Sequence, residues 1–593
     1  MRTHSYCGKE YGGTASRCLE CRQYSFNASP SHRAAGTADD VRRAGGNGPS
    51  TNGRAEVRNE RGTKSHMLEA VIVLWVLSVL EVAAGSITIT VNTNQSRPIS
   101  PWIYGINDYQ SLAGAPRNLT LNRAGGNRWT AYNWENNFSN AGSDWGPYSN
   151  DDGLSRSSVP AEAVRSIIEA DRARTNASLI TVQLQGYVSA DKNGNVDAHD
   201  PNRLAERFKQ VVHQKKALLT NSPSTSDACV YMDEFLWALR SRFTNDIYVD
   251  PVCPTFVSLD NEPELWNTTH FEIQPQPVAP DEFIQKSIRL SQALKALDPK
   301  IQLFGPVHFG FNGLVNWKNA PGFSSSYWFT DQYLERIKAA SDDAGVRLLD
   351  VYDFHWYSEA AVGGARILSL TSSNLNDAQI QAIVQSPRSL WDPTYRENSW
   401  IADFLGGPIR ILDRIQSRIA THWPGTRLAI TEYANGGDNH IAGAIAQADN
   451  LGLFGSYGLF AAASYPTSHN SPFLLAGYKM FRDYDGARGS FGDLSIPAVS
   501  SDTASVSAYL SQDSLRSNRY VAVVINRSNQ SQNVGFMGLN FSGSARVFRL
   551  SGTQTSPVLV QQLPVNLSHW SLSLPSLSIS TIEVVRQSPK DPP

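Results

Sequence analysis

The feature that most constrains the fold is a repeated alternation of short apolar segments and amphipathic helical segments between residues 101 and 480. Helical periodicity is clear at 281–297, where apolar side chains recur on one face. Alternating strand–helix units are typical of a parallel sheet, and this many units favour a barrel. We therefore expect an α/β fold, a TIM-like (β/α)8 barrel over 101–480. The expected strands are 179–184, 255–260, 301–305, 349–355, 427–432 and 457–464, and the other expected helices are 160–175, 203–218 and 231–243.

The sequence changes character after about residue 480, where the helical pattern stops. Short β-rich runs such as "RYVAVVINRS" and "SLSISTIEVV" follow, separated by Ser, Gly and Asn. This pattern is typical of a β-sandwich. The alternating run "SITITVN" at 86–92 can add a strand from the other end of the chain. We expect a sandwich domain formed by residues 85–100 together with 481–593.

The first 84 residues are interpreted as two segments. Residues 1–66 are rich in Gly, Ser, Arg and Asn and lack apolar periodicity, so we expect an unstructured segment or a gene-model extension. The apolar run 70–80 has the length of a signal-peptide core, and Val82-Ala83-Ala84 resembles a cleavage site. Residues 67–84 are therefore predicted to be a signal peptide of a secreted protein. The alternative is a membrane-tethered form that keeps this segment.

Two further features agree with export. N-x-S/T sequons, typical of a secreted glycoprotein, occur at Asn94, Asn118, Asn137, Asn176, Asn267, Asn526, Asn529, Asn540 and Asn566. After the signal segment only Cys229 and Cys253 remain, and they are expected either to pair or to stay separate thiols. The formal net charge of −2 gives no reason to expect nucleic acid or an anionic membrane as a partner, and we expect a monomer.

Candidate catalytic residues follow two of the expected strands. "VSLDNEPELW" at 257–266 places Glu262 after one strand, and "LAITEYANGG" at 428–437 has Glu432 as its only acid. Active sites of such barrels lie where strand C-termini meet their loops. Glycoside hydrolysis needs two carboxyl groups there, one to protonate the leaving oxygen and one to attack or to activate water. Asn261 is placed to hydrogen-bond a sugar hydroxyl, and Glu264 is interpreted as solvated or structural.

Five stretches of the chain together resemble glycoside hydrolase family 44. They are "GGNRWTAYNWENNFSNAGSDW" (125–145), "SLDNEPELW", "DVYDFHWYSEA", "SLWDPTYRENSW" (389–400) and "LAITEYANGG". The resemblance implies a TIM-like barrel with a sandwich built from both chain ends, and endo-acting cleavage of β-1,4-glucan or xyloglucan. It implies a retaining mechanism with Glu262 as acid/base and Glu432 as nucleophile. The chemistry would need no cofactor, and the partner would be a polysaccharide.

Several further residues are expected around this pair. Arg128 in "GGNRW" is expected either to hold the Glu432 carboxylate ionised, as part of the substrate-binding set, or to form a structural ion pair. His355 and Tyr357 alternate along one strand, so both can face the cleft, and Tyr357 is expected to hydrogen-bond Glu432. Candidate sugar platforms are Trp129, Trp134, Trp266, Trp356 and Trp391. Tyr465 follows the last barrel strand, where similar barrels carry Trp.

A metal and other activities stay open. Glu135 and Asp144 lie in an Asn-rich loop that can supply oxygen ligands for a structural calcium, although no ligand spacing is diagnostic. The alternatives to a glucanase are a mannanase or xylanase of similar barrel type, and a non-catalytic polysaccharide-binding protein.

Overall fold

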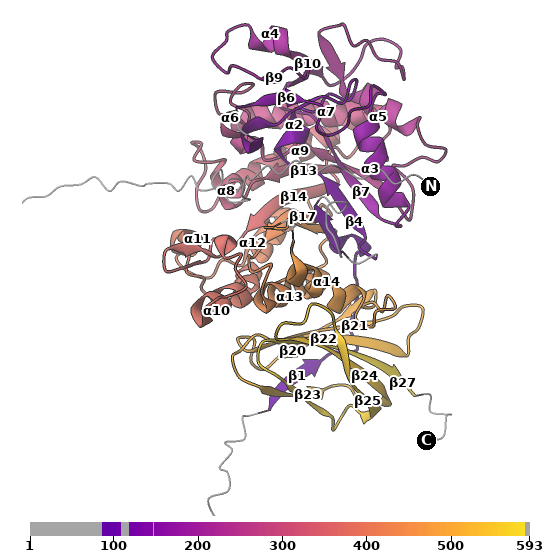
Figure 1. The fold of residues 1–593 in the computed structure, drawn as a ribbon, viewed down its shortest axis with the longest axis vertical. Helices are drawn as coiled ribbons and strands as arrows, with labels where there is room; N and C mark the ends of the chain where they lie inside the picture. Colours follow the sequence, from indigo (N-terminus) through magenta and orange to yellow (C-terminus); the bar gives the residue numbers. More distant parts are fainter. Residues whose placement is uncertain (1–85, 108–114, 116–117, 146, 469, 588–593) are drawn as a thin grey trace, which may run out of the picture. The chain divides into compact units, whose positions relative to one another are not determined.

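The computed structural model describes residues 86–107, 115, 118–145, 147–468 and 470–587 (Figure 1). The predicted segments 1–66 and 67–84 lie outside these residues. Within the described part of the chain, no helix has both the length and the apolar character needed to cross a membrane.

Eight parallel strands form a closed barrel and follow one another in chain order around it. Each pairs in parallel with its neighbours, and β18 pairs with β3 to close the ring. This confirms the predicted TIM-like barrel. The strands are β3 (Gly105–Asn107), β4 (Leu121–Ala124), β7 (Ala177–Val182), β12 (Thr255–Leu259), β13 (Leu303–His308), β14 (Val351–Tyr357), β17 (Arg427–Ala434) and β18 (Ala461–Ser464).

Side chains that alternate along these strands divide the barrel interior into an apolar layer and a polar layer. Leu121 and Val351 belong to one buried apolar cluster inside the barrel. Arg123 lies two residues after Leu121, and His355 and Tyr357 lie four and six residues after Val351. Because successive side chains of a strand point to opposite faces, these three polar groups share the interior with the apolar layer. The polar layer is therefore at the C-terminal end of the strands.

Helices connect the strands and cover the barrel. The main ones are α3 (Glu162–Arg172), α5 (Met232–Arg240), α7 (Pro280–Leu297), α9 (Phe329–Ala344), α12 (Ile411–His422), α13 (Ile441–Tyr457) and α14 (Pro472–Arg482). Shorter helices at the C-terminal ends of the strands include α2 (Asn127–Thr130), α8 (Phe311–Asn316) and α11 (Trp400–Leu405).

Two local predictions were wrong. The expected helix 203–218 ends after one turn, as α4 (Arg203–Arg207), and continues as strand β10 (Phe208–Val212), which pairs with β8 (Tyr187–Ser189) and β11 (Cys229–Tyr231). The β-branched residues of "FKQVV" favour a strand once such partners are present. The chain at Tyr457 is still helical, so the last barrel strand is shorter than 457–464. Cys229 and Cys253 are both free thiols.

The second domain is a sandwich of two sheets (Figure 1). β1 (Ile87–Val91) lies between β20 (Ala498–Ser500) and β23 (Gln532–Met537), and its Ile87, Ile89 and Val91 enter the sandwich core. The fourth strand is β26 (Ser571–Leu574). The other sheet contains β2 (Arg97–Pro98), β19 (Leu494–Ile496), β21 (Val506–Gln512), β22 (Arg519–Asn526), β27 (Ser578–Arg586), β24 (Ser542–Ser551) and β25 (Val558–Asn566). The predicted sandwich from both chain ends is confirmed.

A buried ion pair joins the sandwich to the barrel. Asp449 of α13 contacts Arg527, which directly follows β22, at 3.1 Å, and both side chains are at most 1% exposed. Ser507 and Tyr509 of β21 donate hydrogen bonds to the same carboxylate at 2.6 and 2.8 Å. Asp449 of α13 therefore links the two domains, in addition to the apolar side chains of both that pack in one core cluster.

Candidate active site

Glu262 and Glu432 meet inside the C-terminal end of the barrel. Glu432 belongs to β17, and Glu262 follows β12 as the residue before the short 3-10 helix η4 (Pro263–Leu265). Both side chains are buried, and one carboxylate oxygen of each lies within 4.8 Å of the other. Two strands far apart in the sequence thus bring two carboxyl groups to one place.

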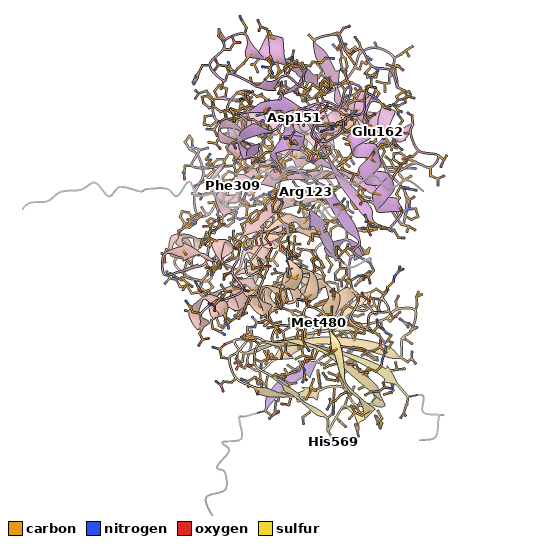
Figure 2. All side chains as sticks on the ribbon, viewed as in Figure 1. Arg123, Asp151, Glu162, Phe309, Met480 and His569 are labelled. Carbon is orange, nitrogen blue, oxygen red and sulfur yellow. The ribbon has the colours of Figure 1, made fainter. Side chains whose placement is uncertain are left out.

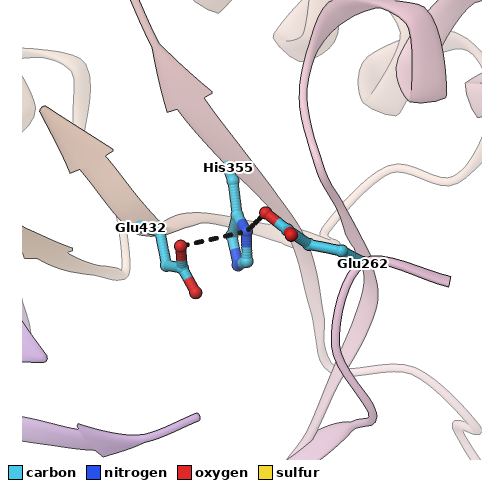
Figure 3. Close-up of side chains that lie close together, drawn as sticks. All are labelled: Glu262, His355 and Glu432. Atoms are coloured by element: carbon cyan, nitrogen blue, oxygen red, sulfur yellow. Dashed lines mark hydrogen bonds and ion pairs between the residues drawn. The ribbon is translucent and has the colours of Figure 1, made fainter. Parts of the chain in front are cut away.

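His355 lies between the two carboxylates (Figure 3). Its Nδ1 is 2.8 Å from Glu262 Oε1 and 3.6 Å from Glu432 Oε2. The pairing of β14 with β17 places His355 opposite Glu432, after a register shift at Phe354. The imidazole can therefore exchange hydrogen bonds with either carboxyl group as their protonation changes.

Glu432 is held by two further donors. The Arg123 guanidinium contacts Glu432 Oε1 at 2.6 Å, and the Tyr357 hydroxyl donates a hydrogen bond to Oε2. The predicted Tyr357–Glu432 contact is thereby confirmed. Arg123 also donates to Asn107 at 3.0 Å and to Asn261 at 2.8 Å. A fixed guanidinium and a phenol favour the ionised form of the Glu432 carboxyl.

The cation beside Glu432 is Arg123 and not Arg128, which corrects the prediction. Figure 2 labels Arg123 on the ribbon. Arg128 lies on α2, outside the barrel strands, and pairs with Asp151 at 2.5 Å and with Ser139 at 2.9 Å. The sequence did not point to Arg123, because the four-residue strand "LNRA" has only a weak strand signal. The two-residue spacing from Leu121 was the available clue.

Asn261 is buried between Arg123 and α2. Its Oδ1 accepts from Arg123, and its Nδ2 donates to Asn127 Oδ1 at 3.2 Å. Because one amide hydrogen bond is fixed at each end, the side chain is oriented before any ligand arrives. Its predicted contact with a sugar hydroxyl remains a prediction.

Most of the expected tryptophan platforms are core residues. Trp134 is 0% exposed and stacks on Phe235, and Trp266 is 1% exposed with its indole N–H bonded to the Asn261 carbonyl. Trp356 alternates with His355, so it faces the helix layer, and Trp129 is likewise buried. The prediction was wrong for Trp134 and Trp266, whose rings have no face left for a sugar. Trp391 is partly buried.

An aromatic pair that the prediction omitted is exposed on the same face of the barrel. Trp400 and Phe404 lie one turn apart on α11 and are 43% and 53% exposed. Both rings pack edge-on against the buried Phe311 of α8, each at 5.7 Å. Tyr465 lies 6.4 Å from Tyr357, ring to ring.

The expected calcium ligands have other partners. Lys209 contacts the buried Glu135 carboxylate, so a cation already neutralises it, and Asp144 accepts from Asn127 at 2.9 Å. Among the described residues, the one group of three or more His, Cys, Asp or Glu side chains close enough to bind a metal is Glu262, His355 and Glu432.

The fold and this site together define a class of protein: barrel glycoside hydrolases with two carboxyl groups at the strand ends. A family model described as glycoside hydrolase family 44 matches residues 138–360. The structure is similar to that of a Paenibacillus polymyxa xyloglucanase of family 44 solved with xyloglucan. The TM-score is 0.78 at 35% sequence identity, over 84% of this chain and 99% of that one. The chain belongs to glycoside hydrolase family 44.

Two curated relatives give the same family context. The chain is 42% identical to Endoglucanase A of Paenibacillus lautus over 458 residues, which are 75% of this chain and 64% of that protein. It is 38% identical to Beta-mannanase/endoglucanase A of Caldicellulosiruptor saccharolyticus over 465 residues, or 74% of this chain and 34% of that protein. The chain therefore spans less than two thirds of the length of either relative.

Proposed function

We propose that this protein is a retaining endo-β-1,4-glucanase acting on cellulose-type glucan or xyloglucan, with Glu262 as acid/base and Glu432 as nucleophile. The observation that carries the proposal is that one carboxylate oxygen of Glu262 and one of Glu432 lie within 4.8 Å of each other. Retaining enzymes hold their carboxyl groups about 5–5.5 Å apart, whereas inverting enzymes leave about 6.5–9.5 Å for a water molecule. The short separation therefore supports double displacement.

The surroundings of the two groups support the assignment of their roles. Arg123 and Tyr357 both donate to Glu432, and a guanidinium and a phenol favour the ionised form of this carboxyl group. Glu432 is thus the group kept ionised for attack on the anomeric carbon. As the carbon–oxygen bond to the leaving sugar breaks, the Glu262 carboxyl transfers its proton to the departing oxygen, and a covalent glycosyl–Glu432 ester forms.

The second half of the reaction reverses these roles. Glu262, now a carboxylate, removes a proton from water, and the water oxygen attacks the anomeric carbon. The ester bond to Glu432 breaks, the sugar is released with its original configuration, and both side chains return to their starting protonation.

The mechanism is tested with the variant Glu432→Gly and azide. We expect the variant to lose several orders of magnitude in kcat and to regain part of it with azide, giving the α-glycosyl azide from a β-linked aryl substrate. Product configuration is read by proton NMR. A Glu432→Gly variant with activity like the native enzyme, or a rescued product of unchanged configuration, would remove Glu432 from the role of nucleophile.

Binding of a polysaccharide is proposed to use the Trp400–Phe404 pair. Their exposed rings can stack on sugar faces, and the hollow beside Phe404 includes Asn316, Ser324 and Arg414, whose polar groups can bond hydroxyls. One relative is named a mannanase as well as an endoglucanase, so mannan and xylan are the alternative substrates. These substrates can be ranked by measuring reducing-sugar release from purified xyloglucan, carboxymethylcellulose, glucomannan and xylan. Binding without release of sugar would instead support a non-catalytic protein.

Secretion is proposed on the basis of residues 67–84 and the sequons. Among the sequon asparagines, Asn94, Asn529, Asn540 and Asn566 are exposed, whereas Asn137, Asn176 and Asn526 are buried. We therefore expect glycans at the exposed group only. N-terminal sequencing of the exported protein tests the cleavage after Ala84, and retention of residues 67–84 in a membrane fraction would support the tethered alternative.

We also propose a monomer, which light scattering of the purified protein tests.

A further inference from the structure

The acid/base candidate occupies a strained segment of backbone. Glu262 has φ of +41° and Asp260 has φ of +67°, both in the left-handed region that residues other than glycine rarely adopt. The Glu262 N–H donates to the carbonyl of Val307 at 3.0 Å, and Val307 itself has φ of +63°. Such conformations persist where the surrounding structure enforces them, and they concentrate at functional sites. What enforces this one is visible on either side of Glu262.

A buried carboxylate ties the N-terminal end of this segment to two neighbouring loops. Asp260 Oδ1 accepts from the Thr130 hydroxyl at 2.7 Å and from the Asn261 N–H at 2.8 Å. Its Oδ2 accepts from the N–H groups of Leu184 and Gln185 at 2.6 and 2.9 Å. Asp260 is 0% exposed, so these four donors replace water completely. The carboxylate thereby joins α2, the loop after β7 and the segment of Glu262.

A second buried carboxylate ties the C-terminal end. Glu264 contacts Nδ1 of His308, the residue after Val307, and accepts from the Phe309 N–H at 3.4 Å. His308 Nε2 lies 3.0 Å from the Tyr352 hydroxyl, which is 2.8 Å from Thr330 Oγ1. Gly313 closes over the pair, because a Cβ there would lie 2.3 Å from the Glu264 carboxylate. Glu264, His308 and Tyr352 are each at most 3% exposed.

We propose that Asp260 and Glu264 are positioning residues that hold Glu262 in its left-handed conformation, so that its carboxyl group faces the glycosidic oxygen. The inference rests on the proposed role of Glu262 as acid/base. It also explains why three carboxylates occur within five residues: the middle one reacts, and the outer two fix the backbone on each side of it. Neither outer carboxylate is assigned a contact with substrate.

Two substrates distinguish a misplaced Glu262 from general damage to the fold. Only proton donation depends on the leaving group, so a misplaced acid affects the two substrates unequally. In Asp260→Asn, an amide NH2 group replaces a carboxylate oxygen that accepts hydrogen bonds. In Glu264→Gln, the contact with His308 is weakened. Both variants keep the side-chain volume. A misplacement of about 1 Å can cost about 100-fold in rate. We expect kcat/KM to fall roughly 10- to 100-fold on an unactivated cello-oligosaccharide and less than about threefold on a dinitrophenyl cello-oligoside, whose leaving group needs little protonation.

Two reference variants show whether a loss of kcat/KM reflects misplacement of Glu262. Glu262→Gln should show the same selective loss, only larger; an equal loss on both substrates would contradict the proposed role of Glu262. Asp171→Asn replaces another buried, hydrogen-bonded carboxylate, outside this segment, and should affect both substrates alike. If Glu262→Gln is selective while Asp260→Asn and Glu264→Gln lower both substrates equally, the positioning inference alone is overturned.

A milder variant covers the case in which Asp260→Asn does not fold. Thr130→Val removes one of the four donors with little change in volume, and circular dichroism with thermal unfolding checks its fold. We expect a smaller loss with the same dependence on leaving group. A folded Thr130→Val variant with the native ratio of kcat/KM on the two substrates would overturn the role of Asp260.

Discussion

At the scale of single residues, the identity of the arginine beside Glu432 matters for the chemistry. One guanidinium contacts Glu432, Asn107 and Asn261, and it lies entirely inside the barrel. A lysine ammonium at the same place has a different geometry and cannot keep this planar set of hydrogen bonds. The orientation of the nucleophile and of the asparagine beside Glu262 therefore depends on the same side chain.

The first prediction compares two conservative changes. Arg123→Lys should lower kcat by about 100-fold, because the loss of one preorganised electrostatic contact costs about 10²–10³ in rate. Arg128→Lys alters a partly exposed pair with Asp151 and should change kcat by less than about twofold. Steady-state kinetics of the two variants on one polysaccharide makes the comparison. An equal effect of the two would contradict the position assigned to Arg123.

A second residue-scale prediction concerns stability and pH. Burial raises the pKa of Asp171 to about 7, against the hydrogen bonds from Ser178 and Asn122, which lower it. The folded protein therefore binds this proton more tightly than the unfolded chain, whose aspartates titrate near about 4. The stability gained from the proton is complete below about pH 4 and is lost as the pH rises through about 7.

The variant Asp171→Asn isolates this contribution. Relative to the native protein, its free energy of unfolding should decline less between about pH 4 and pH 7, because one pKa unit corresponds to about 1.4 kcal/mol. Urea denaturation at several pH values measures both proteins. Parallel curves for the two would show that Asp171 does not titrate in this range.

At the scale of secondary-structure elements, α11 is a short helix with a defined task. Ser399 caps it by accepting from the Ala402 N–H, and Trp400 and Phe404 then lie on one face because they are four residues apart. Phe311 packs edge-on against both rings. Rings that are already ordered lose little conformational freedom when a sugar stacks on them.

This arrangement gives the third prediction. Trp400→Ala should raise KM for long polysaccharide about 10-fold while leaving kcat/KM on a short aryl glycoside within about twofold, since a stacking contact is worth roughly 1–2 kcal/mol. Trp400→Phe should restore most of the affinity because it keeps a ring. Affinity electrophoresis in xyloglucan gels gives a second readout. If Trp400→Ala binds polysaccharide as tightly as the native protein, α11 lies outside the substrate path.

The elements also show what the sequence can predict. Long strands with an alternating or continuous apolar pattern, such as β12, β14 and β17, were identified close to their observed bounds. β3 and β4 were missed because segments of three and four residues are too short for periodicity to appear. In β10, the partners that stabilise a strand come from other segments, so local helix periodicity predicted the wrong element.

The candidate site was predictable to a similar degree. The two glutamates and Tyr357 follow from strand ends and alternation, which are local features. The exposed face of an aromatic ring depends on packing. "SLWDPTYRENSW" contains both Trp391 and Trp400, and the Trp400 ring packs edge-on against Phe311 from a distant segment. The carboxylate clamps at Asp260 and Glu264 depend on loops distant in the sequence, so their partners had no local signal.

At the scale of the whole molecule, one buried ion pair connects the two domains, which belong to one unit of the chain. Asp449→Ala should lower the free energy of unfolding by about 3–5 kcal/mol, because it leaves the Arg527 charge buried without its partner. Asp342→Ala, which breaks an exposed pair with Lys338, should change it by less than about 1 kcal/mol. Chemical denaturation followed by tryptophan fluorescence measures both variants, and similar losses would contradict the role of Asp449 as an anchor.

The position of β1 in the sandwich has a consequence for protein synthesis. Thr88 hydrogen-bonds Ser501, 413 residues later in the chain, and β1 pairs with β23, which lies farther still toward the C-terminus. At a translation rate of about 5–20 residues per second, a ribosome takes roughly 20–80 s to make that intervening length. The barrel strands emerge in order and can pair as they appear. In contrast, Ile87, Ile89 and Val91 of β1 lack their partner strands until β20 and β23 have been synthesised. Until then they form an open strand edge that a chaperone must cover or another nascent chain can occupy.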